Sequence, residues 1–293
     1  MHWIDRLFKT SASAYKKEGN FYYNSALQEE SAHNGFSWAQ SHLGKQARQK
    51  YTTTGAETEI SRLKLSKYLS EHTQSQYDII LDVGCNDGRL TNIILDMGFQ
   101  RVIAADIDYD NVRAVAANNL SRQECLVAVV EDVLNLPIKD QSVDFVLAWG
   151  ILSQVKDWSK ALDCIVKLLK PGGTLFFAEP TLESMMLYAL VQQDLDEYVN
   201  CYATRSRAAY WQDKSVRYKG YAYSEIMALM DHPELEHIQS DGVSVFPSLI
   251  FGALLQNIPT PEDKKQILYE IIMEMDRKGT SLYRVGIEMY RKR

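Results

Sequence analysis

Residues 81–88 read LDVGCNDG, a turn with two glycines between a short apolar run and an amphipathic segment. The apolar run at 79–83 is typical of a parallel strand that is covered on both faces. An apolar stripe at helical spacing follows the turn: Leu90, Ile93, Ile94 and Met97. A turn that joins the carboxyl end of a strand to the amino terminus of a helix predicts a ligand site. Glycines let the backbone come close, free N–H groups are expected to face outward, and the helix dipole favours an anion.

The pattern of the turn indicates which ligand it holds. The G-x-G-x-x-G spacing of nicotinamide and flavin folds is missing. Instead Asp82, Gly84, Asn86 and Gly88 form Asp-x-Gly-x-Asn-x-Gly. This resembles the first motif of the class I S-adenosylmethionine-dependent methyltransferases, which is usually Asp/Glu-x-Gly-x-Gly-x-Gly. Asn tolerates left-handed backbone well, so we expect the loop to keep its shape. The resemblance implies S-adenosylmethionine as cofactor, with Cys85 also among the residues that bind it.

The second predicted strand ends at Asp106, which the resemblance places on the cofactor ribose. A carboxylate there can accept both ribose hydroxyl hydrogens. The alternative is helix capping, because Asp106, Asp108 and Asp110 all precede a predicted helix at 111–120. We expect ribose binding for Asp106 and capping for the other two. Ile107 is included in the predicted cofactor site.

The third predicted strand, at 125–130, ends in Glu131 and Asp132. By resemblance Asp132 accepts a hydrogen bond from the adenine amino group, and Val133 flanks the ring. The alternative is that the two acids form only a polar exit from the strand.

The fourth predicted strand, at 143–149, leads into a segment that lies beneath the reactive sulfonium in the family. Trp149, Gly150 and Gln154 are therefore candidates for lining the methyl-transfer chamber, and Gln154 is a candidate for contacting substrate. The alternative for Trp149 is a place in the core. No Asn/Asp-Pro-Pro-Tyr/Phe sequence stands here, which weakens the case for amide or base amino methylation.

Alternating strands and helices predict an α/β fold with a doubly wound sheet. The fifth strand, at 174–178, ends at Glu179, and the expected closing hairpin uses 237–245 and 281–290. The resemblance implies a Rossmann-like, seven-stranded, mostly parallel sheet whose last strand is antiparallel. Thr260 is expected to cap an added helix between the strands of the hairpin.

The chain divides into four predicted parts. Residues 1–76 are expected to form an N-terminal helical cover, 77–180 the cofactor-binding core, 181–222 a helical lid that contacts substrate, and 223–293 the rest of the core with the added helix. The lid supplies further candidate substrate contacts, with ordinary helix packing as the alternative: Tyr188, Tyr202 and Trp211.

Composition restricts the functional class. The chain has 293 residues, 46% of them apolar, and a net charge of -6, which disfavours a large nucleic-acid surface. No apolar stretch is long enough to span a membrane, and the first residues lack the order of a signal peptide, so we expect a cytoplasmic protein. The four cysteines show no pairing motif, and the histidines form no metal-binding spacing, so we expect neither disulfides nor a metal.

These features together predict an enzyme that methylates an oxygen or nitrogen of a small molecule. The alternatives are an RNA methyltransferase and a protein that binds the cofactor without catalysis. Candidate general bases are His33 in the N-terminal part and Glu179 at the exit of the fifth strand. The acceptor and the oligomeric state do not follow from the sequence.

Overall fold

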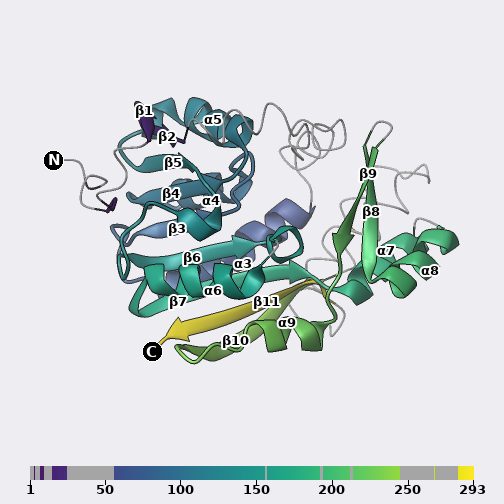
Figure 1. Ribbon diagram of the computed structural model, residues 1–293. Coiled ribbons are helices and arrows are strands. Elements are labelled where there is room, and N and C mark those ends of the chain that lie inside the picture. Colours follow the sequence, from purple (N-terminus) through teal and green to yellow (C-terminus); the bar gives the residue numbers. More distant parts are fainter. Residues whose placement is uncertain are drawn as a thin grey trace.

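The computed structural model describes Trp3 and residues 7–9, 15–24, 56–155, 157–191, 194–211, 214–244, 267 and 283–293 (Figure 1). Its strands are β1 (Lys16–Glu18), β2 (Phe21–Tyr23), β3 (Ile80–Val83), β4 (Val102–Asp106), β5 (Leu126–Val130), β6 (Val143–Trp149), β7 (Leu169–Pro180), β8 (Ser206–Trp211), β9 (Lys214–Lys219), β10 (Leu235–Ser244) and β11 (Tyr283–Lys292). Its α-helices are α3 (Ala56–His72), α4 (Arg89–Asp96), α5 (Tyr109–Asn118), α6 (Trp158–Leu168), α7 (Leu182–Val191), α8 (Leu195–Thr204) and α9 (Tyr223–Leu229).

One sheet of nine strands organises the core, in the order β1-β2-β5-β4-β3-β6-β7-β11-β10. The strands from β2 to β7 run parallel, whereas β11 is antiparallel to both β7 and β10. Seven neighbouring strands, β5-β4-β3-β6-β7-β11-β10, confirm the expected doubly wound sheet with an antiparallel last strand. The count of seven was too low, because β1 and β2 extend the sheet beyond β5.

The N-terminal part contains a β-hairpin where the sequence predicted a helical cover. β1 and β2 pair across a turn in which Gly19 has a φ of 63°. β2 then pairs in parallel with β5, with Phe21 opposite Ala128. Three consecutive aromatic residues favour a strand, and burying them covers the edge of β5. α3 is the helical portion of the described N-terminal residues.

The insertion at 181–222 is only half helical. Helices α7 and α8 pack together, but β8 and β9 form a hairpin where a helical lid was expected. A bridge between Thr181 and Tyr221 joins the two ends of the insertion, and β9 packs against the short 3-10 helix Leu152–Gln154. Figure 1 shows the insertion projecting from the core beside the ends of β7 and β11. The insertion therefore adjoins the carboxyl edge of the sheet.

Apolar residues are buried on both faces of the sheet. α3, α4 and α5 cover one face, and α6 and α9 cover the other. α3 is also anchored by polar contacts, because Lys64 and the hydroxyl of the buried Tyr68 both donate to Asp241 on β10. None of the helices in the described ranges combines the length and the apolar composition that a membrane span requires.

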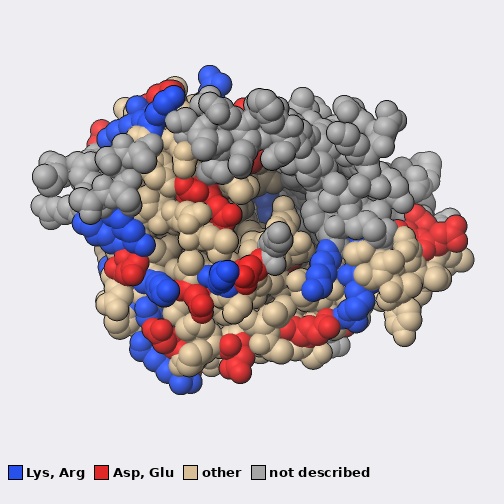
Figure 2. Space-filling model, viewed as in Figure 1, with Lys and Arg blue, Asp and Glu red and all other residues tan. Residues whose placement is uncertain are grey.

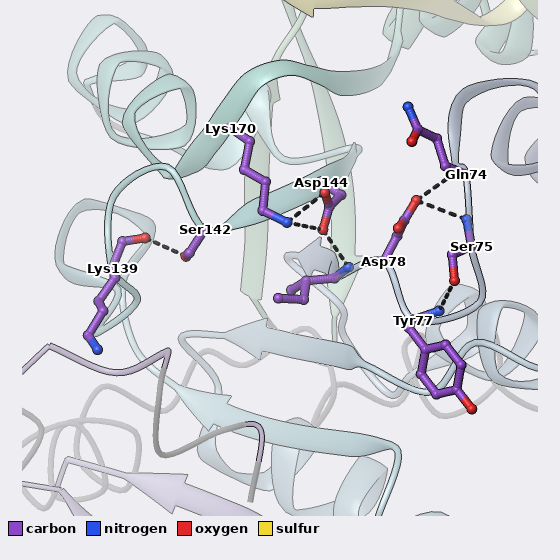
Figure 3. Close-up of polar contacts among 9 residues, drawn as sticks. Gln74, Ser75, Tyr77, Asp78, Lys139, Ser142, Asp144 and Lys170 are labelled. Atoms are coloured by element: carbon purple, nitrogen blue, oxygen red, sulfur yellow. Dashed lines mark hydrogen bonds and ion pairs between the residues drawn. The ribbon is translucent and has the colours of Figure 1, made fainter.

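The amino ends of the central strands β3 and β6 are pinned by one carboxylate (Figure 3). Asp144 Oδ2 accepts from the backbone N–H of Ile79 at 2.9 Å, while the Asp144 N–H donates to the Ile79 carbonyl at 3.0 Å. Lys170 Nζ donates to both carboxylate oxygens at 2.7 Å. In the neighbouring loop Asp78 accepts from the N–H groups of Gln74 and Ser75. Side chains thus fix this edge of the sheet, which lies opposite the glycine loop.

Replacing Asp144 tests this anchoring. Asp144→Ala should lower the free energy of unfolding by about 1–2 kcal/mol, because the buried Ile79 N–H loses its acceptor. Asp144→Asn keeps an acceptor and should cost less. Lys170→Met should cost only about 0.5 kcal/mol, because the ion pair is partly exposed. Urea unfolding of the three variants decides the matter. Equal losses for Lys170→Met and Asp144→Ala would contradict the role given to the Ile79 contact.

Candidate functional site

The loop at 84–88 is shaped by two close approaches. Gly84 has a φ of 72°, and a Cβ there would lie 2.2 Å from Ile151 Cγ2. Gly88 has a φ of 86°, and a Cβ there would lie 2.9 Å from Val115 Cγ2. Between them Asn86 has a φ of 50°, which confirms that Asn holds the left-handed backbone at the position of the usual glycine. The loop therefore fits tightly between the end of β6 and helix α5.

The prediction that free N–H groups of this loop face outward was wrong for four of its residues, one of which is Asn86, whose N–H donates to the Asp106 carboxylate at 2.9 Å. The N–H groups of Gly84 and Cys85 donate to the carbonyl of Ala105 at 2.8 and 3.1 Å, and that of Gly88 donates to the Cys85 carbonyl at 3.0 Å. The reason is that β4 runs beside β3, and the last carbonyl of its ladder needs a donor. Any contact between a ligand and the loop must use other groups.

Asp82 lies beneath the loop. Its side chain is 2% exposed and accepts from Thr91 Oγ1 at 2.6 Å. Burial raises its pKa to about 6. Asp82 therefore joins β3 to helix α4. It would affect the predicted cofactor site indirectly, by supporting the loop.

Asp106 lies at the end of β4, beside the loop. Its Oδ2 accepts from the Asn86 N–H and its Oδ1 from the Asp108 N–H, both at 2.9 Å. Burial raises its pKa to about 6. Asp108 accepts from the Asn111 N–H and begins α5, which confirms the capping expected of Asp108. Ile107, between the two acids, is 52% exposed.

The acids after β5 are tied to the neighbouring backbone. Asp132 accepts from the Leu134 N–H at 2.9 Å and caps the short 3-10 helix Val133–Asn135. The N–H of the buried Glu131 donates to the Asp106 carbonyl at 3.0 Å, which joins the exits of β4 and β5. The polar strand exit is thus present, and adenine binding by Asp132 and Val133 stays a prediction.

Trp149 is the last residue of β6, and its side chain packs against the core. Its ring stacks on Phe176 with centroids 5.8 Å apart, and the Arg89 guanidinium lies over the indole at 5.8 Å from its centroid. Arg89 also donates to Ser61 on α3 at 3.3 Å. Trp149 is partly buried and packs against the core, and its place in the methyl-transfer chamber stays a prediction. Arg89 was not among the predicted site residues, although it follows Gly88 directly.

Glu179, at the end of β7, is bonded to backbone. Its Oε2 accepts from the Leu152 N–H at 3.1 Å and its Oε1 from the Ser153 N–H at 3.2 Å. The side chain is 1% exposed, and burial raises its pKa to about 7. Glu179 therefore holds the segment that follows Trp149 and Gly150.

Among the other predicted residues, Gln154 follows β6 at this edge and Tyr202 is exposed on α8. Gln154 Nε2 donates to the Gly150 carbonyl at 2.9 Å, and Tyr202 on α8 is 72% exposed. Tyr188 lies in α7 and Trp211 in β8, but their side chains fall outside what is described. His33 lies outside the described residues. In the described ranges, no group of three or more His, Cys, Asp or Glu side chains could hold a metal ion.

Residues 81–177 match the family model described as a methyltransferase domain. The chain is 27% identical over 114 residues to a ubiquinone biosynthesis O-methyltransferase of Coxiella burnetii, covering 38% of this chain and 47% of that protein. It is 31% identical over 133 residues to a ribosomal protein L11 methyltransferase of Listeria monocytogenes, covering 45% of this chain and 40% of that protein.

Among solved structures, a SAM-dependent methyltransferase from Methanosarcina mazei superposes with a TM-score of 0.53 at 18% identity, covering 76% of this chain and 96% of that one. This likeness concerns the fold. The chain spans less than half the length of the curated relatives it matches. The order of the parallel strands and the antiparallel last strand agree with the methyltransferase domain that the family model finds at 81–177.

Proposed function

We propose that this protein is an S-adenosylmethionine-dependent methyltransferase that transfers a methyl group to an oxygen or nitrogen of a small molecule. The observation that carries the proposal is the junction of the loop with Asp106. The Asn86 N–H is bonded to the Asp106 carboxylate within the segment that matches the methyltransferase domain. The tight glycine turn therefore contacts the acid that we propose to bind the ribose.

The residues at this junction fit an adenosyl group. A carboxylate offers about four lone-pair positions, so Asp106 can accept from ribose hydroxyls in addition to its two backbone donors. Asn86 Oδ1 is buried without a hydrogen-bond partner among the described residues, so it is an acceptor that a donor could still satisfy. The half-exposed Ile107 offers an apolar surface beside them. Asp132 and Val133 complete the proposed adenine end.

The bound cofactor supplies a methyl group that its sulfonium already activates. The chain's own residues then have to hold the acceptor in line with it and exclude water. Gly150 and Trp149 border the proposed chamber, and β9 packs against the segment that follows them. We assign Glu179 to positioning this segment rather than to proton transfer, because both its oxygens accept backbone N–H groups.

A small acceptor is favoured over RNA by charge. Acidic and basic side chains are interspersed over the described part of the face in Figure 2, and the net charge is -6. Binding to a nucleic-acid backbone draws on clustered cations. The ubiquinone biosynthesis O-methyltransferase relative supports a small-molecule acceptor, whereas the L11 methyltransferase relative bears the name of a macromolecular one.

A methyl-transfer assay tests the proposal. The protein, given S-adenosylmethionine with a labelled methyl group and a metabolite extract, should label a small molecule. Calorimetry with S-adenosylhomocysteine serves as the control for cofactor binding. Tight binding with no transfer would favour a non-catalytic protein. Labelling of RNA, with affinity that falls steeply with salt, would favour the RNA alternative.

Cofactor affinity should depend on pH through Asp106. Ribose hydroxyls donate to the ionised carboxylate, so binding should lower its pKa from about 6 and release a proton. Affinity for S-adenosylhomocysteine should thus be full above about pH 7 and fall as the pH drops below 6. Asp106→Asn should weaken binding and flatten this dependence, as calorimetry across the range would measure. Asp108→Asn, which retains the helix cap, is the matched control and should keep the parent's profile. If the affinity of Asp106→Asn depended on pH as that of the parent does, Asp106 could not be the group that causes the dependence.

Glu179 should make stability depend on pH. Its folded-state pKa, raised from 4.5 to about 7, means that the folded protein takes up the proton more readily than the unfolded chain. Its contribution to stability is therefore full below about pH 4.5 and is lost as the pH rises to 7. When the pH is lowered from about 8 to about 5, the free energy of unfolding of the parent should rise by on the order of 1–3 kcal/mol relative to that of Glu179→Gln. Urea unfolding at the two pH values measures this gain. The exposed Glu183→Gln controls for the loss of one carboxylate, and a parent that gains nothing relative to Glu179→Gln would contradict the raised pKa.

A further inference from the structure

Glu131, at the end of β5, bonds to three other residues: two through its carboxylate and one through its backbone N–H. Its Oε1 accepts from the Asp132 N–H at 2.9 Å, and its Oε2 accepts from the hydroxyl of Tyr15. Its own N–H donates to the Asp106 carbonyl at 3.0 Å. Glu131 is 6% exposed, so its charge depends on these donors.

Tyr15 is held in place by the hairpin that follows it. β2 pairs in parallel with β5, and Asn20 at the hairpin turn bonds to β5 in two ways. Its side chain donates to the Leu126 carbonyl at 3.1 Å, and its carbonyl accepts from the Ala128 N–H at 2.9 Å. The rings of Phe21 and Tyr23 pack edge-on against Tyr109 of α5. The hairpin is therefore part of the core, and it delivers the Tyr15 hydroxyl to the carboxyl edge of the sheet.

We propose that Tyr15 is a positioning residue for the adenine end of the cofactor site, acting through Glu131 on the backbone from which Asp132 projects. This inference rests on the proposed function, because it assigns a role in holding the same cofactor. Burial and the adjacent Glu131 raise the pKa of the Tyr15 hydroxyl, so it stays a hydrogen-bond donor at neutral pH. No adjacent motif marks Tyr15, which stands 116 positions before Glu131.

Without the hydroxyl, Glu131 Oε2 would be buried without its donor. The carboxylate could recover hydration only by turning out of its position, and it would then release the Asp132 N–H. Asp132 would leave the position fixed by its bond to the Leu134 N–H. The contacts of the adenine end should weaken, whereas the contacts made by the loop at 84–88 should not change.

The test is Tyr15→Phe, with Tyr23→Phe as the matched control. Tyr23 belongs to the same hairpin, and its hydroxyl donates to Glu18 at 2.8 Å, so the control removes the same atom from a different partner. Calorimetry should show that Tyr15→Phe raises the Kd for S-adenosylhomocysteine by about tenfold. The Kd for 5′-methylthioadenosine, which lacks the amino-acid end, should rise by the same factor. Tyr23→Phe should bind both ligands as the parent does.

A double variant separates positioning from general loosening of the fold. In an Asp132→Ala background, adding Tyr15→Phe should change the Kd for S-adenosylhomocysteine by no more than about twofold, because the residue through which it acts is gone. Thermal unfolding is recorded for every variant, and binding is measured well below the lowest Tm.

Three outcomes would overturn the inference: an unchanged Kd in Tyr15→Phe with or without a lower Tm, full and independent losses in the double variant, or an equal loss in Tyr23→Phe. If the parent itself fails to bind S-adenosylhomocysteine, the proposed function fails and this inference with it. If the parent binds and Tyr15→Phe binds equally well, only the inference fails.

Discussion

The candidate site depends on one close approach, that of the Gly84 backbone to Ile151. A Cβ at position 84 would lie 2.2 Å from Ile151 Cγ2, closer than any side chain can come. This contact brings the end of β3 against the segment after β6, and these two strands are the centre of the sheet. Asp106, Trp149 and Glu179 lie at the same edge because β4, β6 and β7 run parallel to β3 in the sheet. A larger residue at position 84 would separate the two strand ends.

The acids of the carboxyl edge all hold backbone. Asp106 accepts N–H groups from the loop and from the start of α5, Asp132 caps a short helix, and Glu179 fixes the segment after Gly150. Burial raises the pKa of Asp106 and of Glu179, so both carry a desolvation cost that the backbone donors offset in part. The proposed function gives Asp106 and Asp132 a second role as ligand contacts. Under that proposal, replacing either acid would affect both the backbone that it holds and the binding of the cofactor.

Much of the core could be predicted from local sequence. Unbroken apolar runs indicated the parallel strands, and the glycines of the loop together with Asn86 indicated left-handed backbone. The N-terminal hairpin escaped prediction because its stability comes from pairing with β5, whose residues are far away in the chain. The β8–β9 hairpin was missed because its tyrosines and charges suit a helix face equally well. The direction of the loop N–H groups depends on a carbonyl of β4, which the loop's own sequence does not reveal.

The parallel pairing of β2 with β5 has a consequence for how the chain folds. Phe21 lies opposite Ala128, so an early strand completes the sheet only after three later strands have been made and aligned. Contacts of such long range slow folding, because the closure entropy of the intervening chain is spent before the contact forms. Until then the aromatic face of the hairpin has no partner, and the edge of β5 is open to any other strand. The period of greatest exposure to aggregation would therefore fall during the docking of this hairpin.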